Sequence, residues 1–151
     1  TLFRCPSCEN MLVPIPDTLS LRCKQGHVFD RAREGHVHLL PARKRKQTAP
    51  PIAEEEAMVR ARRAFFDAGG FAPQADALAA EVVRALSLCP QERKQVLAAG
   101  CSEGAYLRLV GDQVEPHQGV DLWGTDTEKL AVRYAARRQP EAQFAVASPH
   151  R

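Results

Sequence analysis

Residues 95–104 decide the fold. They read Gln-Val-Leu-Ala-Ala-Gly-Cys-Ser-Glu-Gly, a short apolar strand that runs into a turn bracketed by two glycines. A helix is expected after the turn, with three apolar positions on its buried side: Tyr106, Leu107 and Val110. Residues 120–126 predict a second strand, residues 130–135 a second helix, and residues 144–147 the start of a third strand. Because strand–helix–strand–helix–strand opens a doubly wound parallel sheet, the predicted fold class is α/β.

Two more helices are expected before this sheet. The first begins near Ala53 and stops at Gly69-Gly70, with apolar residues at spacings of three and four: Met58, Ala61, Phe65 and Ala68. The second runs from about Gln74 to Leu86, and three of its apolar side chains are expected to face inward: Leu78, Val82 and Leu86. Residues 41–53 are basic and bounded by prolines, which disfavour helix, so they predict a linker.

The N-terminal 40 residues hold four side chains at metal-ligand spacing: Cys5, Cys8, Cys23 and His27. The pattern is Cys-x-x-Cys, a spacer of fourteen residues, and Cys-x-x-x-His. It offers two pairs of ligands to one tetrahedral ion and leaves no open coordination position. We therefore predict a structural Zn²⁺ that supplies folding free energy to this small module. His36 and His38 are alternative fourth ligands, but they alternate with Val37 and Leu39 in a strand-like run that favours surface histidines. The remaining alternative is a disulfide with stray thiols.

Composition restricts the setting and the partners. The 151 residues include five cysteines, and thiols free to bind metal favour a reducing, cytoplasmic location over a disulfide scaffold. No apolar run approaches the roughly 20 residues of a membrane span, and the first residues lack the features of a signal peptide. The net charge of +3 permits a polyanionic partner. The run Arg43, Lys44, Arg45 and Lys46 has two open interpretations, a solvated charged face and a contact with RNA phosphates.

The glycine turn predicts a ligand site. A loop that ends a parallel strand and opens a helix lets a ligand approach backbone N–H groups. Gly100 and Gly104 bracket this loop, and Asp126 follows about twenty residues later, where a carboxylate can accept the hydroxyls of a ribose. Glu103 would repel a pyrophosphate but tolerates cationic S-adenosylmethionine, which favours a methyl donor. A glycine pair is also typical of a tight turn without a ligand, and this alternative stays open.

Several motifs together resemble the bacterial 23S rRNA guanine-N1 methyltransferases, which modify a hairpin loop near the peptide exit tunnel. The resemblance covers essentially the whole chain. It rests on Cys-Pro-Ser-Cys at 5–8, Cys-Lys-Gln-Gly-His-Val-Phe-Asp at 23–30, Glu-Gly-His-Val-His-Leu-Leu-Pro at 34–41, Ala-Arg-Arg-Ala-Phe-Phe-Asp-Ala-Gly at 61–69, the Gly100 turn, and Val-Ala-Ser-Pro-His-Arg at 146–151. It implies a zinc-ribbon RNA-recognition module over residues 1–40, a basic linker over 41–53, and a helical segment with the N-terminal part of a Rossmann-like methyltransferase domain over 54–151.

The resemblance also implies an activity. In that family the ribbon contributes to recognition of the RNA hairpin, the Rossmann-like domain binds S-adenosylmethionine, and the subunits form homodimers. The expected reaction is therefore methylation of guanine N1 in a 23S rRNA hairpin. The donor site would comprise the turn and its surroundings: Phe71, Gly100, Ser102, Glu103, Gly104 and Asp126. No catalytic residue is predicted, because methyl transfer of this kind mainly needs positioning.

Two residues depart from the usual family turn, Val-Leu-Asp-Ile-Gly-Cys-Gly-Glu-Gly. Ala98 stands where the family has an acid, and Ser102 stands where it has a glycine. The chain also ends at Arg151, just after the third expected strand, so we expect the remaining strands and the guanine pocket to lie beyond it. We predict weak binding of S-adenosylmethionine and no methyl transfer by these 151 residues. The alternative function is a non-enzymatic zinc-ribbon RNA-binding protein with a degenerate half domain.

Overall fold

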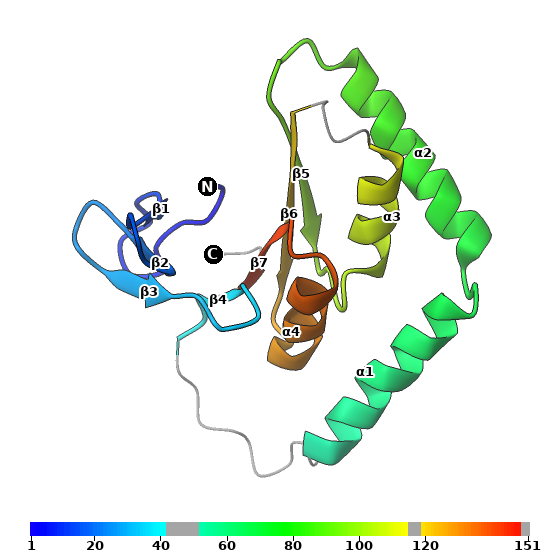
Figure 1. Cartoon of the computed structure of the whole chain (residues 1–151), viewed down its shortest axis with the longest axis horizontal. Helices are drawn as coiled ribbons and strands as arrows, with labels where there is room; N and C mark the ends of the chain where they lie inside the picture. Colours follow the sequence, from blue (N-terminus) through cyan, green and yellow to red (C-terminus); the bar gives the residue numbers. More distant parts are fainter. Residues whose placement is uncertain (42–51, 115–118, 149–151) are drawn as a thin grey trace.

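The computed structural model describes residues 1–41, 52–114 and 119–148, with side chains from residue 55 onward in the second range. The basic run Arg43–Lys46 lies outside these residues. The smaller sheet comprises β1 (Val13–Pro14), β2 (Ser20–Arg22) and β3 (Val28–Asp30). The larger sheet comprises β4 (Val37–His38), β5 (Lys94–Ala99), β6 (Val120–Asp126) and β7 (Gln143–Val146). The helices are α1 (Ile52–Asp67), α2 (Ala72–Leu88), α3 (Ala105–Gln113) and α4 (Lys129–Arg138) (Figure 1).

The larger sheet has the strand order β4-β7-β6-β5, and all its pairs are parallel. β5 pairs with β6 from Lys94↔Val120 to Ala99↔Thr125, and β7 pairs with the other edge of β6. α3 connects β5 to β6, and α4 connects β6 to β7. Parallel strands need such crossover connections, and the predicted α/β fold class with a parallel sheet is confirmed.

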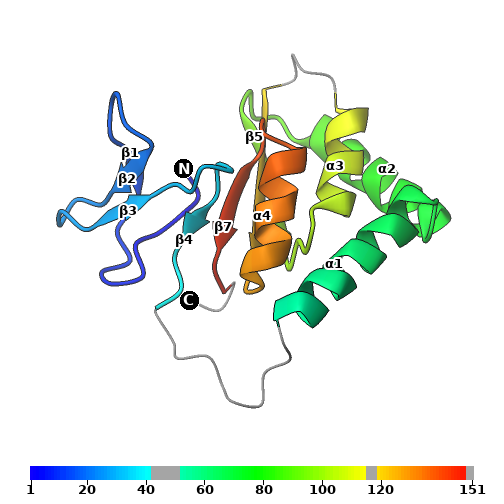
Figure 2. The same cartoon turned by 60° about the horizontal axis from the view of Figure 1, so that its bottom comes forward.

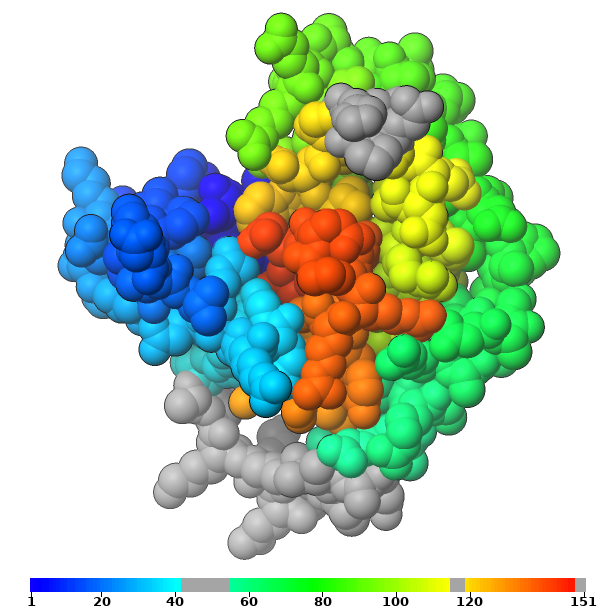
Figure 3. Space-filling view, viewed as in Figure 1, coloured from blue at the N-terminus to red at the C-terminus, as the bar shows by residue number. Residues whose placement is uncertain are grey.

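The N-terminal ribbon and the helices lie on opposite faces of the larger sheet (Figure 2). α3 and α4 pack on one face, while α2 covers α3 and α1 contacts α4. On the other face, Phe3 of the ribbon packs edge-on against Trp123 of β6, with ring centroids 5.0 Å apart. The space-filling view shows the ribbon abutting the sheet domain along β4 (Figure 3). Each face of the sheet therefore has its own apolar core.

β4 joins the ribbon to the larger sheet by backbone hydrogen bonds. Val37 pairs with Ala145 and His38 with Val146, and the Leu39 N–H donates to the Val146 carbonyl at 2.9 Å. Val37 is fully buried in the core between ribbon and sheet. A strand from the N-terminal 40 residues is thus an edge strand of the Rossmann-like sheet, which fixes the ribbon relative to it.

The core on the helical face is built around Phe144, which is 1% exposed. Two glycines make room for it and for α4. A Cβ atom on Gly124 would lie 2.5 Å from Phe144 Cε1, and one on Gly104 would lie 3.0 Å from Ala135 Cβ. Because real side-chain contacts do not come as close as 2.5 Å, position 124 tolerates no side chain while Phe144 stays in place.

The predicted buried stripe of α1 is wrong. Met58 and Phe65 are 58% and 49% exposed, whereas Val59 is fully buried and Phe66 is half-buried. The inward face is therefore shifted by one residue from the predicted one. The shift places two half-buried arginines, Arg62 and Arg63, on the side of α1 that faces the domain.

Three other predicted positions differ in the structure. Leu78 of α2 is 48% exposed, because small residues that include Ala75 and Ala79 form the buried side of this helix, together with Leu86. Tyr106 is 37% exposed, while Leu107 and Val110 are buried as predicted. His36 is 3% exposed and not a surface histidine. Across residues 1–41, 52–114 and 119–148, none of the helices has the length and apolar character needed to cross a membrane.

Candidate metal centre and cofactor turn

The four predicted zinc ligands converge at one point in the ribbon. The ligand atoms of Cys5, Cys8, Cys23 and His27 all lie within 4.8 Å of one another. His27 Nδ1 is 3.5 Å from Cys5 Sγ and 3.4 Å from Cys23 Sγ, and the Sγ atoms of Cys8 and Cys23 are 3.5 Å apart. A tetrahedral zinc ion with ordinary bond lengths separates its sulfur ligands by about 3.8 Å and a sulfur–nitrogen pair by about 3.6 Å. These three separations are close to those expected of a Cys₃His zinc site.

Two tight turns aim these ligands inward. In the first, the Cys5 N–H donates to the Asn10 carbonyl at 2.8 Å, and Glu9 has a positive φ of 58°. In the second, the Gly26 N–H donates to the Cys23 carbonyl at 2.9 Å, and Gly26 has a φ of 87° that favours glycine. The sequence pairs the ligands within each turn, and β2 and β3 bring the second turn to its place.

The thiols of the site are suited to bind metal. The side chain of Asn10 is the largest cause that lowers the pKa of Cys8, to about 6, so this thiol is largely a thiolate at neutral pH. Burial raises the pKa of Cys5, whose thiol therefore needs a metal to ionise. All five cysteines are free thiols, and Cys89 and Cys101 lie outside the ribbon. The alternative of a disulfide is not what the structure shows.

The glycine turn holds three positive φ angles in five residues. Gly100 (75°), Ser102 (48°) and Gly104 (81°) all adopt the left-handed conformation. The N–H groups of Gly100 and Cys101 donate to the Thr125 carbonyl at 2.8 and 2.9 Å, which ties the turn to the end of β6. For a residue with a side chain, the left-handed conformation costs about 1–2 kcal/mol. Ser102, which stands where the resembling family has glycine, is therefore held in a strained conformation by its surroundings.

Asp126 is held directly against this turn. Its Oδ2 accepts a hydrogen bond from the Ser102 N–H at 2.9 Å, and its Oδ1 accepts one from the Glu128 N–H at 2.9 Å. The structure therefore brings together the predicted residues of the turn and the predicted acid of the second strand. A carboxylate oxygen accepts more than one hydrogen bond, so both oxygens keep acceptor capacity for a ligand.

Glu103 lies inside the turn. It is 1% exposed, and its Oε2 accepts a hydrogen bond from Ser102 Oγ at 2.6 Å. A buried carboxylate needs a compensating charge, and Arg62 of α1 lies 3.5 Å from the same oxygen. Sequence patterns do not single out Arg62, because arginines on a helix are usually solvated. A half-buried arginine beside a fully buried glutamate is visible only in three dimensions.

Phe71 belongs to an aromatic cluster beside the turn. It lies at the α1–α2 junction with a φ of 59° and is 53% exposed. Its ring lies 5.2 Å from that of Phe65 and 6.2 Å from that of Phe66, and Phe66 lies 5.3 Å from Tyr106. Tyr106 follows Gly104 by two residues, so the cluster reaches the start of α3. Phe71 is thus linked to the turn through two other rings.

Cys101 is a packing residue in this site. Burial raises the pKa of its thiol to about 12, so the thiol stays protonated at neutral pH. Because the thiolate is the reactive form, Cys101 cannot act as a nucleophile there. Its Sγ lies beside Gly124 in the core, which accords with packing of a small side chain.

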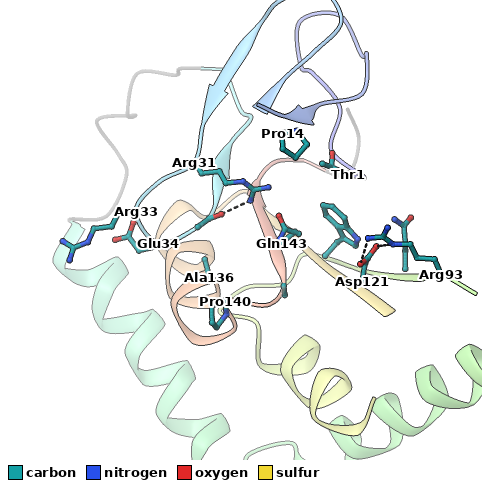
Figure 4. Close-up of a pocket in the computed structure, with 14 residues that line it drawn as sticks. Thr1, Pro14, Arg31, Arg33, Glu34, Arg93, Asp121, Ala136, Pro140 and Gln143 are labelled. Carbon is teal, nitrogen blue, oxygen red and sulfur yellow. Dashed lines mark hydrogen bonds and ion pairs between the residues drawn. The ribbon is translucent and has the colours of Figure 1, made fainter. Parts of the chain in front are cut away.

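Two clefts lie between the ribbon and the sheet, beside the contact of Phe3 with Trp123. One, of about 720 Å³, lies at the carboxyl ends of the strands and is lined by residues that include Phe3, Leu97 and Thr125. The other, of about 830 Å³, lies at the amino-terminal ends (Figure 4). In it, Arg93 donates to both carboxylate oxygens of Asp121, at 2.9 and 3.3 Å. The second cleft is at the opposite end of the sheet from the glycine turn.

Comparisons with known proteins agree with this architecture. Residues 3–48 match the zinc-ribbon family described as RlmA, N-terminal. A 23S rRNA (guanine(748)-N(1))-methyltransferase of Streptomyces fradiae is 39% identical over 145 residues, which is 96% of this chain and 48% of that protein. Relatives from Micromonospora griseorubida (35% over 159 residues, 95% of this chain and 50% of that protein) and Bacillus subtilis (26% over 148 residues, 97% and 50%) carry the same enzyme class in their names.

The fold and the two sites define a class of protein, a zinc ribbon built into the edge of a Rossmann-like sheet that carries a glycine turn. The matches point to one family: the ribbon matches the RlmA N-terminal model, and most of the chain is similar to proteins named 23S rRNA (guanine-N1)-methyltransferases. It spans about half the length of the curated relatives that it matches.

Proposed function

We propose that this chain supplies the RNA-recognition and donor-binding parts of an S-adenosylmethionine-dependent 23S rRNA guanine-N1 methyltransferase. One observation carries the proposal: Asp126, at the carboxyl end of β6, is hydrogen-bonded to the turn that ends β5. In open α/β sheets, ligands bind outside the carboxyl ends of the strands. The names of the relatives from Streptomyces fradiae and Micromonospora griseorubida support the reaction class.

The donor would be held by the turn and the residues around it. Gly100 and Gly104 let the backbone of the turn come close to a ligand, and Asp126 offers acceptors to the ribose hydroxyls. Glu103 and Glu128 add negative charge, which suits a cationic ligand and not a phosphate. When bound, S-adenosylmethionine supplies an electrophilic methyl group. The residues named here bind and orient the donor, and none is assigned as a base.

Recognition of the RNA hairpin is assigned to the ribbon and to the basic run Arg43–Lys46 that follows it. The ribbon is fixed to the sheet through β4 and β7, so RNA bound to it would be held at a constant position relative to the donor turn. A homodimer with a cleft between its subunits and a cytoplasmic location complete the proposal. The homodimer rests on the family resemblance, and the location rests on the free thiols.

Calorimetric titration of S-adenosylmethionine into the chain tests the donor site. Asp126→Asn should weaken binding by about tenfold or more, because it removes a charged acceptor from the hydrogen bonds to the ribose. Asp121→Asn is the matched control, since Asp121 lies on the same strand and pairs with Arg93 at the other end of the sheet. Wild-type protein that shows no binding at millimolar donor would contradict the donor-site assignment. Transfer of labelled methyl to a hairpin RNA by the complete protein tests the reaction.

A second function is favoured by two residues of the turn. Ala98 provides no carboxylate, and Ser102 places a side chain in a left-handed conformation where the resembling family has glycine. Both features would suit a non-enzymatic zinc-ribbon RNA-binding protein. Such a protein would bind a hairpin RNA but show no calorimetric signal of binding with S-adenosylmethionine. The same titration therefore distinguishes the two functions.

A further inference from the structure

Arg62 extends from α1 to the glycine turn. Its Nη1 donates a hydrogen bond to Ser102 Oγ and lies 3.5 Å from Glu103 Oε2 and 3.7 Å from Glu128 Oε2. Ser102 Oγ in turn donates to Glu103. A helix outside the sheet therefore contributes a cation to the site that the turn and the end of β6 form.

Three carboxylates lie around the turn. Glu103 is buried, and Asp126 and Glu128 are half-buried at the end of β6. Burial raises the pKa of Glu128, the charges of Asp126 and Glu103 raise it further, and the charge of Arg62 opposes the rise. Among the described residues, Arg62 is the one cation within 4.0 Å of the carboxylates of Glu103 and Glu128. Without it, the site would attract a sulfonium and an ammonium but repel a carboxylate.

S-adenosylmethionine has all three charged groups. Its sulfonium and ammonium suit the acidic surroundings, whereas the carboxylate of its amino-acid end needs a cation or N–H donors. The three contacts of Arg62 all use Nη1. A guanidinium binds a carboxylate best through two parallel N–H bonds, and Nε with Nη2 forms an edge suited to that geometry. The Arg62 side chain is 36% exposed, so it can be reached from solvent.

We propose that Arg62 binds the carboxylate of the donor's amino-acid end. The inference rests on the proposed function, because it needs the donor to occupy the turn. Arg62 is then a donor-binding residue supplied by α1, so the affinity for the donor depends on the position of α1. The contacts with Ser102 and Glu103 then hold the guanidinium in place before the donor arrives.

The test compares two ligands that differ by this one carboxylate. S-adenosylmethionine and decarboxylated S-adenosylmethionine are titrated by calorimetry into wild-type chain and into Arg62→Ala. Loss of a charge-assisted hydrogen-bonded pair should weaken S-adenosylmethionine about 10- to 100-fold in the variant, with little change for the decarboxylated ligand. Arg62→Lys, which keeps the charge but not the fork, should give an intermediate loss for the first ligand only.

Arg63→Ala is the matched control. Arg63 is the next residue of α1, but its guanidinium lies 3.7 Å from Asp67 and 5.9 Å from the Tyr134 ring centroid, so neither ligand should be affected. Thermal unfolding of each variant checks that it is folded. Equal weakening of both ligands in Arg62→Ala would show a merely structural role and overturn the inference while leaving the proposed function intact. Wild-type chain that binds neither ligand would overturn both.

Discussion

Removal of zinc should uncouple the ribbon from the sheet, and Trp123 should report it. Trp123 is the one tryptophan of the chain, is 5% exposed, and packs edge-on against Phe3 of the ribbon. We expect chelation of the metal, or the substitution Cys23→Ala, to unfold the ribbon and expose this indole. The larger sheet would keep its helical face, where Phe144 and its neighbours form a separate core.

The contributions of apolar burial and of zinc to the stability of the ribbon can be compared. Three large apolar side chains of the ribbon are almost fully buried: Phe3, Leu12 and Leu21. Their burial contributes about 5–9 kcal/mol at about 1.5–3 kcal/mol each. A structural Cys/His zinc site contributes about 10–16 kcal/mol in isolated zinc-finger peptides. The metal is thus the larger stabilising contribution, and the short strands β1, β2 and β3 cannot compensate for its loss.

Intrinsic fluorescence measures the exposure of Trp123, and far-UV circular dichroism measures how much helix is retained. The expected result is a shift of the emission to longer wavelength, with most helical signal retained, and recovery on adding Zn²⁺. Cys89→Ala is the control, because Cys89 is a free thiol at the end of α2, outside the ligand set, and its removal should leave the emission unchanged. Unchanged emission in the chelated protein or in Cys23→Ala would refute the reasoning that metal holds the ribbon against β6.

Two further predictions concern stability. Gly124→Ala should lower the free energy of unfolding by about 1–3 kcal/mol, because its Cβ would overlap the immobile ring of Phe144. In Gly70→Ala the three atoms nearest to the new Cβ belong to the ring of Phe65, which is exposed and can turn toward solvent, so a smaller loss in thermal unfolding is expected. Equal losses in the two variants would contradict a cause in core packing. A hydrogen bond from Arg133 lowers the pKa of the Glu34 carboxyl in the folded protein. The ion pair therefore stabilises the fold at pH values above the unfolded-state pKa of about 4.3. This stabilisation is lost as the pH falls through the lower pKa of the folded state. Wild-type chain should therefore exceed Glu34→Gln in melting temperature at pH 7 and lose that advantage in acid, and a difference independent of pH would contradict this assignment.

The metal centre and the sheet could be predicted because their signals are local. Each pair of zinc ligands lies within five residues, and Cys-x-x-Cys followed by Cys-x-x-x-His is a spacing typical of zinc sites. The strands at 95–99 and 120–126 are apolar runs that end in glycine or acid, and both form nearly as predicted. Asp126 could be predicted from its distance along the chain from the turn, which the crossover connection largely fixes.

The positions predicted wrongly are those whose burial or partners depend on contacts between segments distant in the sequence. Two apolar sets run along α1 one residue apart, Met58 with Phe65 and Val59 with Phe66, and periodicity alone cannot choose between them. The choice depends on α4, against which α1 packs. Arg62 was missed for the same reason, since its partners lie on the turn and beyond β6. His36 is buried because the neighbouring Val37 pairs with β7, a contact that no local pattern indicates.

The pairing of β4 with β7 has a consequence for synthesis on the ribosome. The ribbon is made before β7 and can bind zinc at once, yet its edge strand β4 must wait for a partner, Ala145, made about a hundred residues later. During that interval Val37 and Phe3 lack the surface that buries them. Bound metal would therefore keep the nascent ribbon folded until β7 is made and its pairing with β4 joins the ribbon to the sheet.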